Sequence, residues 1–243
     1  MQIKNKYFIN RIKVKFFHLL KAKNNDYLHR FKNNYETFIS TIEHKSFIRF
    51  GDGEAVIMMG GDIYFQKYNK KLANDLKTCM QTDRLVKCYH RCIFEKPLPK
   101  NWENLYYFFI KYEKTNIVFD AMYLRRDFRG YSDELFYRLT LFFKMLQNYE
   151  IVLVHNDEQN RFYLEEILKK EVSFVKIASK NAYEKKNEIL KSIINRVKNI
   201  NNTRILISAG PTAKVLVKEL SDMGYIAYDV GHIPYKEYYC KKN

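Results

Sequence analysis

Two carboxylates stand one residue apart in the segment Arg49-Phe50-Gly51-Asp52-Gly53-Glu54, which follows a short apolar run. In an extended segment residues i and i+2 point to the same side, so Asp52 and Glu54 could aim at one point. Gly51 and Gly53 would allow a ligand to approach the backbone closely. Mg²⁺ and Mn²⁺ prefer oxygen ligands, often one or two carboxylates together with a substrate's phosphates. The alternative is a solvated turn, because Asp-Gly is a common turn dipeptide.

A second segment joins an apolar stretch to a predicted helix through Gly210-Pro211-Thr212. Proline suits the first position of a helix, and the backbone N–H groups of a helix start can bind a phosphate. Lys214 could add positive charge there. An ordinary strand-to-helix turn would use the same residues, so this segment alone leaves both interpretations open.

Polar side chains also follow two other apolar stretches. Asp229 and His232 close the last of them, and both residue types serve as metal ligands or acid–base groups. Lys180 and Asn181 follow a second apolar stretch, at residues 173–177, and could contact a nucleotide. Asn181 also fits the N-cap of the next helix. Each of these residues, taken alone, is equally compatible with a structural role.

The elements that must position these groups alternate along the chain. Apolar runs predict strands at residues 46–50, 116–120, 150–154, 173–177, 203–208 and 225–230. Apolar residues at three- and four-residue spacing predict helices at 25–45, 69–80, 102–114, 132–147, 161–170, 182–197 and 211–223. This alternation predicts an α/β protein with a Rossmann-like, mostly parallel sheet flanked by helices. Ligands of such sheets bind beyond the carboxyl ends of the strands, where the polar segments above are expected.

Composition and charge limit the class of protein to which the chain can belong. The 243 residues are 47% hydrophobic, which is enough for one sizeable folded domain, and no linker-like segment divides them. The chain shows neither a run of about 18 apolar residues nor a signal-peptide pattern, so we expect an intracellular protein. The net charge is +16. Half of this excess lies in residues 1–50, which contain eleven Lys or Arg and only three acidic residues.

The first 24 residues form a basic extension in which Phe8, Ile12, Phe16 and Leu20 recur at helical spacing, with no acidic residue among them. A basic amphipathic helix of this kind could lie on an anionic membrane surface. It could equally pack on its own domain and leave the basic face in solvent. Nucleic acid is a less favoured partner, because the chain has no recognisable nucleic-acid-binding motif.

The segments RFGDGE, ILISAGPTAKVL and GYIAYDVGH together resemble the GT-D type glycosyltransferases, a bacterial family with a D-x-E motif. The resemblance covers about residues 38–237, and the motifs occur in the family's order. Between them, Asp120-Ala121-Met122 with Arg125 is similar to the family's Asp-Ala-aromatic segment and its arginine, and KNAY is similar to its Asn-Ala-aromatic segment.

The resemblance implies a UDP-sugar-dependent hexosyltransferase that uses Mn²⁺ or Mg²⁺. Its acceptor would be a surface polysaccharide, a lipid-linked oligosaccharide or a glycoprotein. One transferase domain would span residues 25–243, in the cytoplasm, and residues 1–24 could contact the inner face of the cytoplasmic membrane. The alternative is a Rossmann-like protein that binds a nucleotide or nucleic acid without catalysis.

The resemblance also implies roles for individual residues. The expected catalytic residues are Asp52, Glu54 and His232. The expected metal ligands are Asp52, Glu54 and Asp229. The expected donor-binding residues are Arg49, Gly51, Gly53, Arg125, Lys180, Asn181, Gly210, Pro211 and Thr212.

Overall fold

A single parallel sheet organises the chain. The computed structural model describes residues 14, 28–94, 102–125 and 132–242. Its eight strands are ordered β1-β4-β3-β2-β8-β7-β5-β6, and every pairing in the sheet is parallel. The strands are β1 (Phe31–Lys32), β2 (Phe47–Phe50), β3 (Val86–Tyr89), β4 (Val118–Asp120), β5 (Glu150–His155), β6 (Ser173–Lys176), β7 (Thr203–Ile207) and β8 (Ile226–Asp229). The predicted fold class is confirmed.

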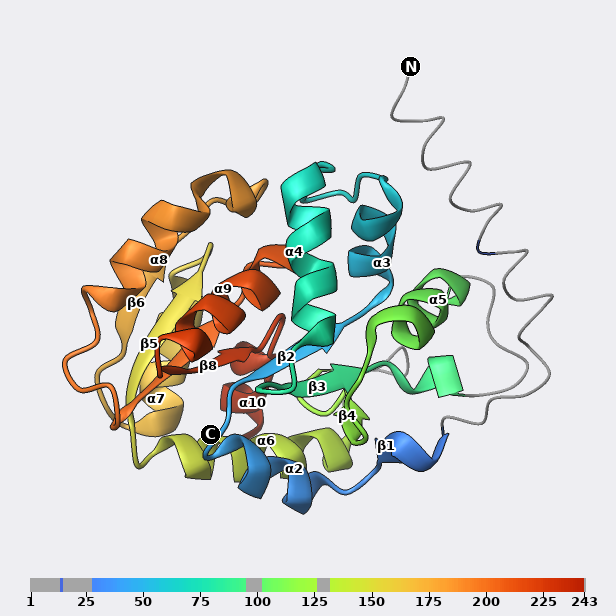
Figure 1. Ribbon diagram of the computed structural model, residues 1–243. Coiled ribbons are helices and arrows are strands. Elements are labelled where there is room, and N and C mark those ends of the chain that lie inside the picture. The colour runs from blue at the N-terminus through green and yellow to red at the C-terminus, as the bar shows by residue number, and fades with distance from the viewer. Residues whose placement is uncertain (1–13, 15–27, 95–101, 126–131, 243) are drawn as a thin grey trace.

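Helices cover both faces of the sheet (Figure 1). One face carries α3 (Asp52–Met59), α4 (Lys70–Gln81), α5 (Glu103–Tyr112), α8 (Lys186–Ile194) and α9 (Pro211–Asp222). The other carries α2 (Tyr35–Ile42), α6 (Asp133–Leu146), α7 (Gln159–Leu168) and α10 (Tyr235–Lys242). Short 3₁₀ turns occur at η1 (Leu28–Arg30), η2 (Arg91–Phe94) and η3 (Ala182–Lys185). Connections that run towards β1 cross the first face and those that run towards β6 cross the second, as crossovers of one hand require.

Each helical layer packs its apolar side chains on the sheet, so the core has two halves. All five residues of β7 are buried, because this strand is covered on both faces. On the α2 side, Phe38 packs against Phe47, Phe119 and Tyr123, with ring centroids 5.2 to 5.4 Å apart. The two layers hold the strands in a fixed register, which places their carboxyl ends side by side.

The predicted helix over residues 25–45 is wrong in its first half. The structure has η1 and β1 there, and α2 begins only at Tyr35. The cause is local, because the Asn34 side chain accepts a hydrogen bond from the N–H of Thr37 at 2.7 Å and thereby caps α2. Strand β1 then pairs with β4 at the edge of the sheet.

Sequence analysis also missed strand β3 and helix α10. Strand β3 contains Lys87 in a fully buried run, so it lacks an apolar pattern. The Lys87 ammonium lies 2.7 Å from Glu113 Oε1 and also donates to the Met80 carbonyl oxygen. Helix α10 lies in the polar tail, where Tyr235 and Tyr238 bury their rings on the α6 side.

The predicted membrane-contacting helix in residues 1–24 lies outside the described residues, apart from the buried Val14. Among the described residues, no helix is both long enough and apolar enough to cross a membrane.

Candidate active site

A buried lysine ties three elements together at the carboxyl ends of the central strands. The Lys214 ammonium, in the first turns of α9, lies 2.7 Å from Glu54 Oε1 and 3.0 Å from Asp229 Oδ2. It also donates to the Gly210 carbonyl oxygen at 3.3 Å, so each of its three N–H groups can reach an acceptor. Burial alone would lower the pKa of Lys214, but the charges of Asp229 and Glu54 outweigh it and raise that pKa. The lysine therefore stays charged at neutral pH.

Strands β2 and β8 supply the next charge pair. The backbone N–H of Arg49 donates to Asp229 Oδ2 at 3.1 Å, and Arg49 Nη2 lies 3.8 Å from Asp229 Oδ1. Gly231, with φ of 52°, leaves the space that the guanidinium fills, because a Cβ there would lie 1.8 Å from Arg49 Nη2. Arg49 Nη1 reaches across to the carbonyl oxygen of Ala121 at 3.4 Å. Arg49 thus links β2 to the segments that follow β4 and β8.

The predicted extended conformation of the Asp52–Glu54 segment is wrong, because α3 begins at Asp52. Gly51 is the N-cap, and Glu54 turns back so that its Oε2 accepts the Gly51 N–H at 2.9 Å. Residues i and i+2 of a helix lie about 200° apart around its axis, so the two carboxylates diverge. Glu54 is 8% exposed and faces Lys214. Asp52 is exposed and accepts the N–H of Gly53 at 3.0 Å.

Exposed polar side chains form the rim above these buried charges. Asp52, Arg125 and His232 are all exposed. Arg125 lies within electrostatic reach of Asp52, Glu54 and Asp229, and the structure therefore brings it to the site. Desolvation, followed by the charges of Arg125 and Arg49, lowers the pKa of His232. This imidazole is therefore neutral near pH 7 and can accept a proton.

His155, at the end of β5, lies close to His232 and was not singled out by sequence analysis. It is 7% exposed, and its Nδ1 accepts the N–H of Asp157 at 2.9 Å. Burial and the neighbouring His232 lower the pKa of His155. In the sequence, His155 directly follows the apolar run at residues 150–154. The same kind of position singled out Asp229 and could have singled out His155.

The Gly210-Pro211-Thr212 turn lies next to this cluster. Pro211 begins α9, as predicted, and Gly210 precedes it with φ of 55°. Gly210 is partly exposed, whereas Pro211 and Thr212 are buried. The Thr212 hydroxyl has no hydrogen-bond partner among the described residues. The ring of Phe65 covers Gly210 so closely that a Cβ there would lie 2.6 Å from it.

Lys180 and Asn181 lie on the outer side of that turn. Asn181 does not cap η3 with its side chain, since Asn181 Oδ1 accepts the N–H of Lys67 at 2.9 Å. Its backbone N–H donates to the Phe65 carbonyl oxygen. Lys180 is exposed, and its ammonium lies 4.6 Å from the centre of the Tyr64 ring. Asn181 is thus engaged in holding the loop between α3 and α4, while Lys180 faces solvent.

Of the three expected metal ligands, Asp52 is the one whose carboxylate is exposed to solvent. Among the described residues, no three His, Cys, Asp or Glu side chains converge on a point. Glu54 and Asp229 already contact Lys214, and Asp52 offers the open carboxylate. Mg²⁺ and Mn²⁺ are often held by one carboxylate together with water and a substrate's phosphates, and these residues fit a cation of that kind.

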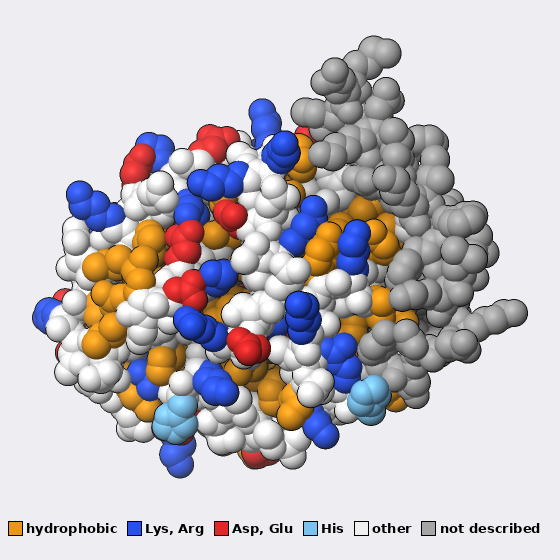
Figure 2. Space-filling model, viewed as in Figure 1, with side chains coloured by type: hydrophobic (Ala, Val, Ile, Leu, Met, Phe, Trp, Pro, Cys, Tyr) orange, Lys and Arg blue, Asp and Glu red, His pale blue; other side chains and the backbone are white. Residues whose placement is uncertain are grey.

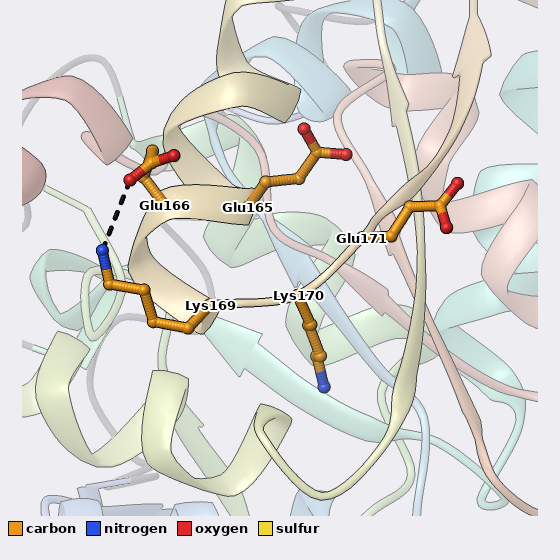
Figure 3. Close-up of a pocket in the computed structure, with 5 residues that line it drawn as sticks. All are labelled: Glu165, Glu166, Lys169, Lys170 and Glu171. Carbon is orange, nitrogen blue, oxygen red and sulfur yellow. Dashed lines mark hydrogen bonds and ion pairs between the residues drawn. The ribbon is translucent and has the colours of Figure 1, made fainter.

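A hollow of about 310 Å³ elsewhere on the surface is unrelated to this cluster (Figure 3). It lies at the amino end of β6, between the end of α7 and the start of that strand, whereas the cluster lies at the carboxyl ends of the strands. Its lining is Glu165, Glu166, Lys169, Lys170 and Glu171. Lys170 is engaged there with the carbonyl oxygens of Leu146, Gln147 and Tyr149 at the end of α6. The hollow therefore reflects the packing of α7 on α6.

A known family shares this fold and these segments. Residues 47–242 match the family model described as glycosyltransferase GT-D fold. The chain belongs to this family. A solved structure described as a new glycosyltransferase from Streptococcus sanguinis superposes with a TM-score of 0.71 at 20% identity, over 86% of this chain and 84% of that one. Another, a domain of unknown function 1792 described as having a distinct glycosyltransferase fold, gives 0.65 at 27% identity, over 86% and 79%. The family resemblance seen in the sequence is confirmed.

Curated relatives extend the comparison to longer proteins. Glycosyltransferase GlyD of Streptococcus pneumoniae serotype 4 is 25% identical over an alignment of 217 residues, and the match covers 82% of this chain and 26% of GlyD. Probable glycosyl transferase Gly of Streptococcus gordonii is 25% identical over an alignment of 206 residues, and the match covers 77% of this chain and 29% of that protein. The chain thus spans little more than a quarter of the length of these relatives.

Replacing Lys214 with Met tests whether its ammonium stabilises the fold. The change leaves two buried carboxylates without their shared cation, and we expect the free energy of unfolding to fall by about 3–5 kcal/mol. Lys218→Met is the matched control, because Lys218 lies one turn further along α9 in a more exposed pair with Asp222. In the same urea titration, the control substitution should lower the free energy of unfolding by less than about 1 kcal/mol. Equal losses in the two variants would contradict the role given to Lys214.

Proposed function

We propose that the site binds the diphosphate of a UDP-sugar and transfers the sugar to a hydroxyl group of a glycan acceptor. The observation that carries this proposal is the division of charge at the strand ends. The buried residues Glu54, Asp229 and Lys214 form ion pairs with one another, while Asp52, Arg125 and His232 remain open to a ligand. Asp229 Oδ1 is buried without a hydrogen-bond partner among the described residues. Membership of the GT-D fold family supports sugar transfer as the reaction.

Asp52 would hold the divalent cation, Mn²⁺ or Mg²⁺. A bound cation would neutralise negative charge on the leaving diphosphate. Arg125 is exposed near Asp52 and would contact the phosphates directly. Glu54 and Asp229 would act indirectly, because their contacts with Lys214 and Arg49 fix the start of α3 and the end of β8.

His232 would accept the proton of the acceptor hydroxyl. The carboxylates of Glu54 and Asp229 are weaker candidates for this role, since both are buried and already contact Lys214. His232 is exposed, and its lowered pKa keeps it neutral at pH 7. A neutral imidazole at the rim is suited to general base catalysis.

The acceptor would be a surface polysaccharide, a lipid-linked oligosaccharide or a glycoprotein, and the basic N-terminal residues would bring the enzyme to the inner face of the membrane. The alternative of nucleic-acid binding predicts affinity for random DNA that falls steeply with salt. On the face shown in Figure 2, basic side chains are scattered among acidic and apolar ones. That mixed surface and the family membership favour the transferase.

Asp52→Ala should remove the effect of metal on nucleotide binding. We expect UDP to bind the unaltered protein in the presence of Mn²⁺ and to bind the variant at least about tenfold more weakly, as calorimetry would show. Asp222→Ala is the control, because Asp222 is an exposed carboxylate at the far end of α9. UDP affinity unchanged by both EDTA and Asp52→Ala would refute the metal assignment.

The pH profile tests His232 as the base. Because its pKa lies below the usual value of about 6.5, it should stay neutral from pH 8 to near 6.5, and kcat should fall as it is protonated at lower pH. His232→Gln should lower kcat by about 10²- to 10⁴-fold and abolish this acid limb. Its UDP affinity should stay close to that of the parent. A variant with a normal kcat and the same acid limb would exclude His232 as the base.

A further inference from the structure

Two aromatic side chains occupy the tip of a tight turn beside the candidate site. Between α3 and α4, Ile63 and Gln66 form an antiparallel bridge with N–H to carbonyl distances of 3.0 and 3.2 Å. Tyr64 and Phe65 are the two residues between them. Neither residue has a positive φ, so this turn accepts most residue types. Backbone geometry therefore gives no reason for two aromatic residues here.

Both aromatic side chains of the turn are exposed to solvent. The Tyr64 side chain is 86% exposed, more than any other large hydrophobic residue in the described part of the chain. Phe65 is 39% exposed, and the rest of its ring packs on Gly210. Adjacent exposed aromatics next to a polar site are characteristic of a binding surface.

The turn is held rigidly in place. Asp62 Oδ1 accepts the N–H of Tyr68 at 2.6 Å and closes the loop at its base. Asn181 fixes the far side, since its N–H donates to the Phe65 carbonyl oxygen at 2.9 Å and its Oδ1 accepts the N–H of Lys67. Asn181 adopts a left-handed conformation with φ of 53°, which asparagine tolerates better than most residues. An aromatic side chain carried on a hydrogen-bonded backbone of this kind loses less entropy when a ligand stacks on it than one on an unsupported loop.

The position of the turn indicates what stacks there. Phe65 contacts the residue before α9, so the aromatic tip adjoins the helix start. The Lys180 ammonium lies over the Tyr64 ring, within reach of a negatively charged group beside it. An aromatic ring beside a cation and next to a charged cluster matches a ligand in which a planar base is joined to phosphates.

The geometry points to Tyr64 as the stacking platform for the donor's nucleobase, with Lys180 contacting the adjoining phosphate. This inference rests on the proposed function, because it assigns the base of the same nucleotide. Phe65 positions the turn against Gly210 and is a positioning residue. Base–aromatic stacking accepts any base, so the platform supplies affinity and leaves the choice of uracil to other contacts.

Calorimetry with two probes, UDP and inorganic diphosphate, tests the inference in the presence of Mn²⁺. Tyr64→Ala should weaken UDP binding about 5- to 150-fold, the equivalent of about 1–3 kcal/mol of stacking, and leave diphosphate binding unchanged. Tyr64→Phe should bind UDP like the parent protein. Lys180→Ala should weaken both probes. Tyr137→Ala is the matched control, because Tyr137 is 54% exposed and lies on α6. This substitution should change neither UDP binding nor diphosphate binding.

The outcomes separate this inference from the proposed function. If the parent protein binds no UDP, the proposed function itself fails. If the parent binds UDP and Tyr64→Ala binds it equally well, only the platform is refuted. An unchanged UDP affinity together with a raised KM for the acceptor would also refute it, since the ring would then serve the acceptor sugar.

Discussion

The buried ammonium of Lys214 is the interaction on which the site depends. It contacts Glu54 at the start of α3 and Asp229 at the end of β8, and it is itself part of α9. Three elements from distant parts of the chain are therefore fixed by one charge. Because both carboxylates are buried, their charges need this compensation if the fold is to be stable. Arg49 extends the same network to β2 and to the segment after β4.

This arrangement separates structural charge from charge that a ligand can use. The buried layer is held by internal ion pairs, and the rim of Asp52, Arg125 and His232 stays accessible. A diphosphate with its cation needs both an open carboxylate and positive side chains, and the rim supplies both. The aromatic turn at Tyr64 continues the rim on the α9 side. In the proposed function, the phosphates, the proton transfer and the nucleobase would each be served by neighbouring but distinct groups.

Sequence analysis predicted the fold class and most strands, because apolar runs bounded by polar turns are local signals. It failed where long-range contacts decide the conformation. Lys87 interrupts the apolar pattern of β3, and only its pairing with Glu113 makes burial tolerable. The Asp52–Glu54 spacing was read as extended, whereas the return of Glu54 to the Gly51 N–H begins a helix. Lys214 was expected to face a phosphate, and its burial between two carboxylates was not predictable from spacing.

The most direct test of the central claim is an anomalous difference map from crystals of the protein grown with Mn²⁺ and UDP. The structure predicts a manganese peak beside the Asp52 carboxylate and the nucleotide's phosphates, with the Lys214 ammonium still between Glu54 and Asp229. A manganese peak between Glu54 and Asp229, with Lys214 displaced, would contradict this account. The Lys214 ammonium would then occupy the cation site only in the absence of metal.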